Sequence, residues 1–353
     1  MRALAVTYCA GWKHKGSVYL LANTVAAMSI APSRRQISLG ELLTDARPDV
    51  VEEASLKLVR IAPGTAVACL GDEGLAAQIF DFLRAHGRDA ASNAELLALL
   101  ACRSDLFDEG RSAELLLASS SSDGSAELLH WSSQDGLSTA GSDFQQIGRP
   151  MPFHAALSPD LLSILAAGDL ASDRVLPVIA AIVQSQGVRG MSIDLNADGL
   201  VFGLRTESGT VTWQEDTLVI VYDQAFASCT HVAVLARDDE LVVHSSENNA
   251  TRVCTSPTSM RHCPTREIAW LRDIQAELTA DRYRYRTFIS TSENVITLII
   301  RSDFDRESRY LRLNARGYGQ FDLAFSPELT ALLLSPMHEK NRAIPLRLSV
   351  RED

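Results

Sequence analysis

The sequence predicts an α+β fold. Residues 1–224 are expected to form a four-layer αββα sandwich, in which two antiparallel sheets lie between two layers of helices, and residues 225–353 a second, smaller α+β domain. Along the chain, strands alternate with pairs of helices, an order that such a sandwich accommodates with short connections. The composition shifts after Tyr222, and 353 residues exceed one ordinary domain of about 100–200 residues.

Strands are predicted where apolar and polar residues alternate or where short apolar runs end in turn residues. In the first domain they cover residues 4–9, 17–22, 56–61, 65–70, 114–119 and 126–131, a short strand that ends at Gly148, and a closing hairpin that pairs 190–205 with 210–222. In the second domain they cover residues 231–235, 241–245, 287–290, 294–301, 308–313 and 321–325. Residues 28–54 have weak periodicity and are interpreted as an inserted loop.

Helices are predicted where apolar residues recur at helical spacing. Leu75, Ile79 and Phe82 mark one face of a helix over 73–85, which His86 and Gly87 end. The other predicted helices cover residues 93–102, 155–168 and 172–186 in the first domain and 265–279 in the second.

Composition and charge exclude several classes of protein. With 46% apolar and 22% charged residues the chain is globular rather than disordered. The net charge of −11 disfavours nucleic acid as the main partner. No run of eighteen apolar residues exists, so no membrane-spanning helix is expected, and the first residues lack a signal-peptide pattern. Cys9 and Cys69 lie in apolar runs typical of core thiols, which suits a reducing cytoplasm.

Several segments resemble, in order, the opening of proteasome β-type subunits. They are Thr7 to Gly11, Ser17 to Thr24, Lys57 to Ile61 and Ala68 to Gly71, and the likeness continues through Gln145 to Gly148 and Gly190 to Asp194. The initial Thr-Tyr-Cys resembles the Anbu type of bacterial proteasome homologue most, with the HslV peptidase next. The resemblance covers about residues 3–222 and implies an N-terminal-nucleophile hydrolase fold.

The resemblance also implies a mechanism. Removal of residues 1–6 would make Thr7 the first residue, whose α-amino group can act as the general base for its own hydroxyl. Lys57 falls on the lysine that keeps this amine at a useful pKa, and Asn23 on the position that orients the lysine. Gly71 falls on the residue whose N–H stabilises the oxyanion.

The sequence departs from the family at several of these positions. Asn23 replaces an aspartate, Arg149 replaces the serine of a Gly-Ser-Gly triplet, and Gln186 replaces the aspartate of an Asp-x-x-Ser-Gly element. Together with Asp194, Arg149 and Gln186 are taken as supporting positions. Val6 precedes Thr7 where active β-subunits usually have glycine.

Two functions of different class therefore stay open. One is a self-processing threonine peptidase or amide hydrolase; the other is a catalytically inactive homologue that serves as an oligomeric scaffold or binding protein. The resemblance implies no cofactor and no metal, self-association into a ring or stack, and a peptide or protein substrate. Whether an ATP-driven unfoldase is a partner stays open.

Simpler interpretations compete with these. Thr7 fits an ordinary β-branched strand residue, and Cys9 is a weaker alternative nucleophile because it lies in the middle of a strand. Residues 194–199 resemble the start of a twelve-residue calcium-binding loop. However, Arg205 stands at the twelfth position of that loop, where glutamate is expected, and this favours a β-turn.

Cys254, His262 and Cys263 could be soft metal ligands, although their spacing fits no zinc template. Residues 282–286 interleave arginine and tyrosine, a pattern of single-strand binders, and are expected to be one solvated strand face in this acidic chain.

Overall fold

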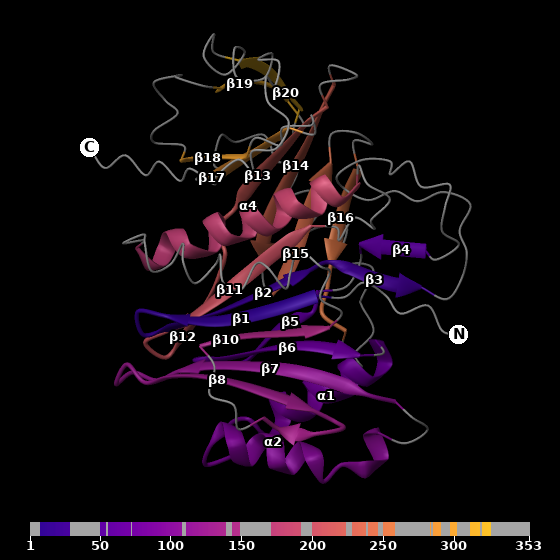
Figure 1. Ribbon diagram of the computed structural model, residues 1–353, viewed down its shortest axis with the longest axis vertical. Coiled ribbons are helices and arrows are strands. Elements are labelled where there is room, and N and C mark those ends of the chain that lie inside the picture. Colours follow the sequence, from indigo (N-terminus) through magenta and orange to yellow (C-terminus); the bar gives the residue numbers. More distant parts are fainter. Residues whose placement is uncertain are drawn as a thin grey trace, which may run out of the picture.

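The structure is a computed structural model with more strand than helix, which confirms the α+β class (Figure 1). It describes residues 8–28, 50–53, 56–71, 73–107, 111–138, 143–148, 171–191, 200–223, 228–237, 239–245, 250–257, 283, 285–290, 297–301, 311–317 and 320–325. The predicted helices over 155–168 and 265–279 lie outside these residues, as do Met1 to Thr7.

Sheet 1 contains five antiparallel strands in the order β10-β1-β2-β11-β12. Their bounds are β1 Tyr8–His14, β2 Ser17–Asn23, β10 Phe144–Gly148, β11 Val201–Glu207 and β12 Thr210–Trp213. The first strand thus runs to His14, beyond the predicted end at residue 9, because the turn to β2 needs only Lys15 and Gly16, both with positive φ. Every residue of β2 is buried, which shows that both faces of this sheet are covered.

Sheet 2 contains five antiparallel strands in the order β5-β6-β7-β8-β9. Their bounds are β5 Leu58–Ala62, β6 Thr65–Gly71, β7 Ala113–Ser120, β8 Ala126–Ser132 and β9 Gly136–Leu137. The Pro63 and Gly64 turn lies between β5 and β6, as the sequence predicts. Alternate residues of β7 belong to different core clusters: Leu116 and Ala118 to one, Leu115 and Leu117 to another.

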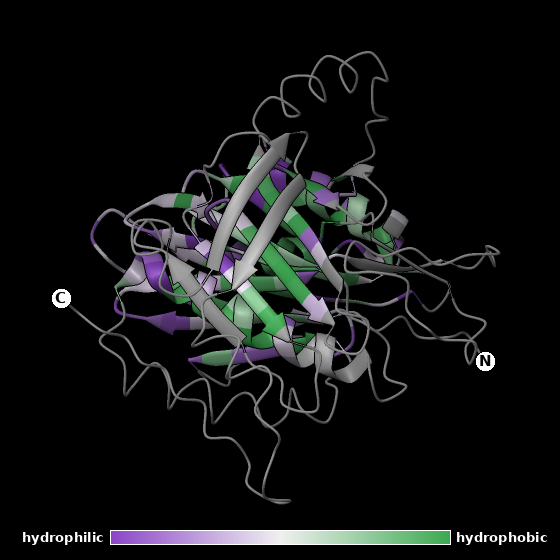
Figure 2. Ribbon diagram, turned by 90° about the horizontal axis from the view of Figure 1, so that it is seen from above, coloured by the Kyte–Doolittle hydropathy of each residue, from purple (hydrophilic) through white to green (hydrophobic). Residues whose placement is uncertain are grey.

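Helices lie against one face of each sheet. Helices α1 (Glu73–His86) and α2 (Asn93–Ala101) share a core cluster with β5, β6 and β7 of sheet 2. Helix α4 (Ser172–Met191) shares another with β1, β2, β10 and β11 of sheet 1. A third cluster joins the remaining face of sheet 1 to the remaining face of sheet 2. Figure 2 shows hydrophobic residues concentrated in the central strands, as expected for sheets that are buried on both faces.

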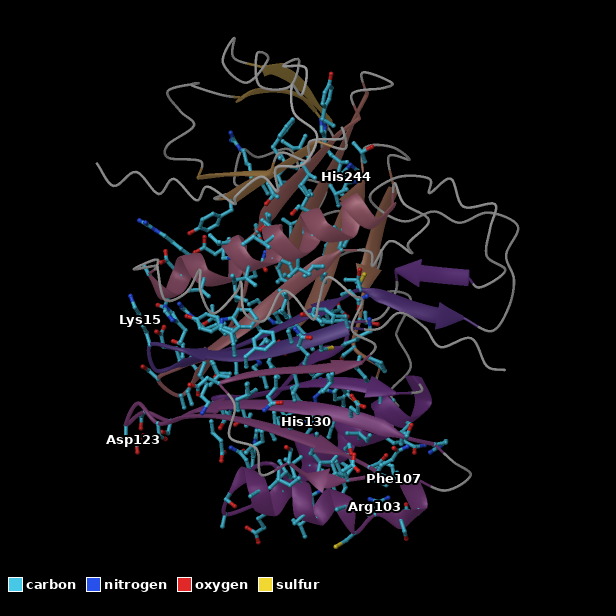
Figure 3. The ribbon with its side chains drawn as sticks, in the orientation of Figure 1. Lys15, Arg103, Phe107, Asp123, His130 and His244 are labelled. Atoms are coloured by element: carbon cyan, nitrogen blue, oxygen red, sulfur yellow. The ribbon has the colours of Figure 1, made fainter. Side chains whose placement is uncertain are left out.

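The hairpin turns of sheets 1 and 2 gather at the same end of their strands. Lys15 and Asp123, labelled in Figure 3, mark two of these turns at the same side of the ribbon. Three hydrogen bonds tie the turns together: Ser120 N donates to Gly64 O at 3.0 Å, Val211 N donates to Pro63 O at 2.8 Å, and Gly209 N donates to Ser120 Oγ at 3.2 Å. The other end of the strands, where β1 begins and where β2 and β6 finish, holds the candidate site.

Gly64 is the tightest point of this turn cluster, since a Cβ at this position would lie 2.5 Å from the carbonyl oxygen of Ser120. We therefore expect Gly64→Ala to lower the free energy of unfolding by about 1–3 kcal/mol, because backbone atoms on both sides leave little room to shift. Gly124→Ala is the matched control: Gly124 has a φ of 85° but nothing within 4 Å, so its cost is about 1 kcal/mol from the backbone alone. Urea unfolding of both variants measures the difference; an equal or smaller loss for Gly64→Ala would contradict the steric argument.

Sheet 3 contains six strands in the order β16-β15-β14-β13-β17-β18. Their bounds are β13 Thr217–Asp223, β14 Ser228–Arg237, β15 Glu240–Ser245, β16 Ala250–Cys254, β17 Tyr285–Ser290 and β18 Thr297–Arg301. The predicted closing hairpin is therefore shorter than expected: its second half contains β12, which pairs with β11, and β13, which pairs with β14 and β17 instead.

The inner cluster between sheets 1 and 2 continues into sheet 3. Its members from sheet 3 are Val219, Val221, Val232, Val234, Leu241, Val243, Cys254 and Ile289. Asp239, at the tip of the β14–β15 hairpin, adds a polar contact with each of the other two sheets. One oxygen accepts from Arg60 Nη2 at 2.9 Å and the other from Trp213 Nε1 at 3.0 Å.

Two small sheets complete the described residues: β3 (Val25–Met28) pairs with β4 (Val50–Glu53), and β19 (Leu311–Gly317) pairs with β20 (Gln320–Phe325). The expected loop over 28–54 thus ends in a strand.

The expectation of a solvated strand face over 282–286 is wrong for Tyr283, Tyr285 and Arg286, which are all buried. Within the described ranges, no helix is long and apolar enough to cross a membrane.

Candidate active site

Asn23, the last residue of β2, is the centre of the candidate site. Its side chain is 1% exposed, and its Oδ1 accepts a hydrogen bond from the backbone N–H of Tyr8 at 3.2 Å. Tyr8 begins the described part of β1, and its peptide nitrogen is the atom bonded to the carbonyl carbon of Thr7. The side chain of Asn23 therefore holds the backbone directly after the predicted nucleophile.

Lys57 reaches Asn23 from sheet 2. The residue is only 6% exposed, and its Nζ donates to Asn23 O at 2.8 Å and to Asn23 Oδ1 at 2.5 Å. Its backbone is fixed from both sides, because Cys69 N donates to Lys57 O at 3.0 Å and the neighbouring Leu56 N donates to Thr255 O at 2.9 Å. Leu56 and Leu58 both belong to the inner core cluster, so the chain around Lys57 is anchored by apolar packing.

The structure brings two sequence-predicted residues into direct contact and places a third at the same end of the strands. Lys57 and Asn23 touch, and Gly71 ends β6, paired with Ala113. A Cβ at Gly71 would approach the carbonyl oxygen of Ser112 to 3.1 Å, so a side chain there would crowd the neighbouring strand. Thr7, Arg149 and Asp194 lie outside the described residues, and Gln186 lies in α4 with only its backbone described.

Thr24, next to Asn23, has a structural role. Its Oγ1 donates to Leu200 O and accepts from Leu200 N, both at 3.2 Å, in a fully buried setting. These bonds join the end of β2 to the start of β11 and so fix the backbone on which Asn23 stands.

Cys9 is an inert thiol rather than a second nucleophile. It is completely buried in the inner cluster, and burial raises its pKa to about 12, although the charge of Lys57 acts in the opposite direction. Burial also raises the pKa of Cys69. Because the thiolate is the reactive form of cysteine, neither side chain is a nucleophile at neutral pH. Both are core thiols, as the sequence predicts.

The burial of Cys9 and the exposure of Cys102 predict a labelling pattern. With folded protein at pH 7.5, iodoacetamide is expected to modify the exposed Cys102 within minutes and to leave Cys9 unmodified over the same period, because Cys9 is buried and protonated. Peptide mapping by mass spectrometry reports both residues in one sample, and Cys102 serves as the internal control. Modification of Cys9 at a comparable rate would return it to the list of candidate nucleophiles.

Sequence reasoning missed Glu114 at this end of the strands. Glu114 is half-buried at the start of β7, and its Oε2 accepts a hydrogen bond from Gly148 N at 3.1 Å. The sequence pattern could have identified it, because Glu114 shares its strand face with the inner-core residues Leu116 and Ala118.

Among the described residues no group of three or more histidine, cysteine or acidic side chains could hold a metal ion. Of the three soft ligands considered from the sequence, Cys254 is buried in the apolar cluster, whereas His262 and Cys263 lie outside the described ranges.

Comparison with known proteins shows similarity to solved structures. No protein-family model matches the chain, and no curated protein matches it. Among solved structures the chain is similar to eukaryotic HslV from Trypanosoma brucei, with 16% sequence identity and a TM-score of 0.40 over 57% of this chain and 99% of that chain. At this degree of similarity, the functional interpretation depends on the residues of the chain itself.

Proposed function

We propose that the chain is a proteasome-like N-terminal-nucleophile hydrolase that cleaves peptide or other amide bonds through Thr7. The proposal includes the four-layer αββα arrangement of residues 1–224, a cytoplasmic location and no cofactor. The three core clusters support the arrangement, because they alternate helix, sheet, sheet and helix in the manner of such a sandwich.

The observation that carries the proposal is the buried contact between Lys57 and Asn23 beside Tyr8. Burying a lysine ammonium costs several kcal/mol unless it is paired and hydrogen-bonded. The Lys57 ammonium donates two hydrogen bonds to Asn23, whose side chain also accepts from the N–H of Tyr8. A cation is thus held near the peptide bond between Thr7 and Tyr8, where a threonine nucleophile with a free amine needs a neighbouring positive charge.

The proposed chemistry has two stages. In the first, Thr7 Oγ1 attacks the carbonyl carbon of Val6, the bond between Val6 and Thr7 nitrogen breaks, and water hydrolyses the resulting ester to release residues 1–6. In the second, the freed α-amino group of Thr7 takes the proton of Oγ1 as the hydroxyl attacks the carbonyl carbon of a substrate amide. The carbon–nitrogen bond of the amide breaks, the leaving amine takes that proton, and water hydrolyses the ester on Thr7 to release the acid and restore the hydroxyl. The ammonium of Lys57 keeps the α-amine of Thr7 unprotonated, and the N–H of Gly71 stabilises the oxyanion.

Intact mass and N-terminal sequencing of natively purified protein test the first stage. We expect a chain that begins at Thr7, and we expect Thr7→Ala to retain residues 1–6 and to hydrolyse no peptide amide from a panel with chromogenic leaving groups. Thr210→Ala is the control, since Thr210 is an exposed strand threonine far along the chain. A wild-type chain that keeps Met1 or Arg2 and hydrolyses no member of the panel would remove the peptidase proposal.

One observation favours the scaffold alternative. Asn23, which accepts two hydrogen bonds from the Lys57 ammonium, carries no formal charge, whereas the family has a carboxylate at this position. A site that had lost catalysis could tolerate this loss of charge. Under this alternative, residues 1–6 stay attached and Thr7→Ala leaves the assembly unchanged.

Self-association into a ring or stack is part of both proposals. The outer side of α2 supports it: Ala98, Leu99 and Ala101 are exposed there, and Leu99 has 42% of its surface accessible. Light scattering at micromolar concentration should give a mass that is a multiple of the subunit mass, which is 38.4 kDa before any removal of residues 1–6. A monomeric mass would count against this part of the proposal.

A further inference from the structure

The peptide group between Asn23 and Thr24 is hydrogen-bonded on both sides. Its carbonyl oxygen belongs to Asn23 and accepts from Lys57 Nζ at 2.8 Å. Its N–H belongs to Thr24 and donates to Leu200 O at 2.8 Å. Because a peptide group is planar, its two ends cannot turn independently of each other. The position of Leu200 therefore sets the direction in which the carbonyl of Asn23 meets the lysine.

The side chain of Thr24 binds both backbone polar groups of Leu200. In a regular antiparallel pair, the N–H of Leu200 would donate to the backbone oxygen of Thr24. Here it donates to Thr24 Oγ1 instead, and Oγ1 donates to Leu200 O, both at 3.2 Å. Both residues are only 1% exposed, so these bonds lie in the interior, where they are stronger than in water.

The side chain of Gln184 holds the next residue, Val201, from the other side. Val201 is the register partner of Asn23, and because hydrogen-bonded and non-bonded pairs alternate, its N–H points away from β2. The register pairs of β12 with β11 begin only at Leu204, so that strand does not cover Val201. Gln184 is buried on α4, which packs over β11 on the outer face of sheet 1, and its Oε1 accepts the Val201 N–H at 2.8 Å (Figure 1). The glutamine thus supplies the acceptor that a buried N–H requires.

We propose that Thr24 and Gln184 are positioning residues for Asn23. By holding residues 200–201 from two sides, they keep both oxygens of Asn23 directed at their donors, which are Lys57 Nζ and the first N–H of β1. This role rests on the proposed function, since Asn23 serves the nucleophile through Lys57. It joins helix α4 to the site through a buried amide.

Nearly isosteric substitutions remove these hydrogen bonds without opening a cavity. Thr24→Val replaces the hydroxyl with a methyl group, whereas Thr24→Ser retains the hydroxyl. Gln184→Met keeps the length of the side chain but offers no oxygen. Thr206→Val is the matched control: Thr206 is fully buried near the opposite end of β11, and among the described residues its Oγ1 has no hydrogen-bond partner.

Hydrogen exchange at the Tyr8 amide tests this role without any substrate, because Tyr8 N donates to Asn23 Oδ1. The reference is the Lys13 amide, which lies near the opposite end of β1 and donates to Asp143 O at 2.8 Å. ¹⁵N NMR of deuterated protein measures both exchange rates. A general loss of stability raises both rates together, whereas a displaced Asn23 raises only that of Tyr8.

The ratio of the Tyr8 rate to the Lys13 rate is the quantity to compare. We expect Thr24→Val and Gln184→Met each to raise this ratio about tenfold, as the loss of one hydrogen bond implies. Thr24→Ser and Thr206→Val should leave the ratio close to that of the wild type.

Catalysis gives the second readout, measured well below the unfolding temperature of each variant. Thr24→Val and Gln184→Met are expected to slow the removal of residues 1–6 and to lower kcat for peptide hydrolysis about tenfold, with KM nearly unchanged. The reason is that the positioned groups act on the nucleophile and not on the binding of substrate. Thr24→Ser should restore the activity, and Thr206→Val should keep it.

The outcomes separate this role from the proposed function. If neither variant changes the exchange ratio, the positioning role is wrong, whatever the enzyme activity; a change in only one variant overturns the role of the other residue. If the ratio changes but the wild type neither sheds residues 1–6 nor hydrolyses amides, Thr24 and Gln184 still position Asn23 and the peptidase proposal is wrong. An equal loss of kcat in Thr206→Val would also overturn the role. If Thr24→Val does not fold, Gln184→Met, which leaves Thr24 in place, decides by the same ratio.

Discussion

Replacing Lys57 with methionine is expected to reduce removal of residues 1–6 and amide hydrolysis by about a thousandfold, while the protein still folds. Methionine fills the buried space of the lysine stem but carries no charge, so the amine of Thr7 would be protonated and unable to act as a base at neutral pH. Asn23 would lose the ammonium as a donor to both of its oxygens, at a cost of about 1–3 kcal/mol. Removal of a buried charge offsets part of this cost. Intact-mass analysis and peptide hydrolysis measure the activity, and thermal unfolding measures the stability.

Lys13→Met is the matched control for this variant. Lys13 lies on β1, in the same sheet as Asn23, but its side chain is partly exposed and its ion pair with Asp143 spans 3.3 Å at the surface. Exposed pairs of this kind contribute about 0–1 kcal/mol, so both activity and stability should stay close to those of the wild type. Full processing and hydrolysis in Lys57→Met would show that the buried ammonium has no part in the chemistry.

A chain that ends at residue 224 is expected not to fold into a stable monomer. Eight residues of the inner cluster lie on β13, β14, β15, β16 and β17, and six of them follow residue 224. Truncation would remove them and leave β13 without either neighbouring strand. Exposing that apolar surface costs about 25 cal/mol per Å², and an unpaired strand edge promotes aggregation. The soluble fraction and the emission of the buried Trp12 and Trp131 report whether the remaining sheets pack.

A single substitution in the full chain tests, without removing any residues, whether the first 224 residues depend on sheet 3 for their stability. Val234 on β14 is 2% exposed within the shared cluster, so Val234→Asp places an unpaired carboxylate there and should cost more than 3 kcal/mol. Leu99→Asp is the control, because Leu99 is exposed on α2. If the two halves fold separately, Val234→Asp leaves the emission of Trp12 and Trp131 and their unfolding transition unchanged. That result, or a soluble and cooperative 1–224 chain, would contradict the shared core.

The sequence predicts most of sheets 1 and 2 because their strands show period-two patterns and end in recognisable turns. Pro63 with Gly64 and Ser208 with Gly209 both lie where a turn is expected. The helices α1 and α2 follow from apolar spacing, and Ser92 caps α2 by accepting from Glu95 N, a local signal. The pairing of Lys57 with Asn23 was expected from the resemblance, not from any local pattern.

The placement of β13 could not be predicted in this way. Its sequence is apolar on both faces, so it fits equally the end of a hairpin with β12 and the middle of another sheet. Strands over 231–235 and 241–245 were expected, but nothing in their pattern indicates that they complete the core of the first domain. The domain boundary at residue 224 stays a prediction, although the cluster that crosses it is continuous.

By itself, then, the sequence determined most strands of sheets 1 and 2, helices α1 and α2, and which of their residues share a face. The resemblance added Thr7, Asn23, Lys57 and Gly71 as the candidate residues of a threonine hydrolase. Only the tertiary structure decided which sheet or helix packs against each face of a given sheet. It joined Lys57 to Asn23 across the two sheets, placed Glu114 on Gly148 and closed the core with sheet 3. The physical reason is that periodicity records whether a side chain is buried, whereas the partner that buries it comes from a strand far away in the sequence.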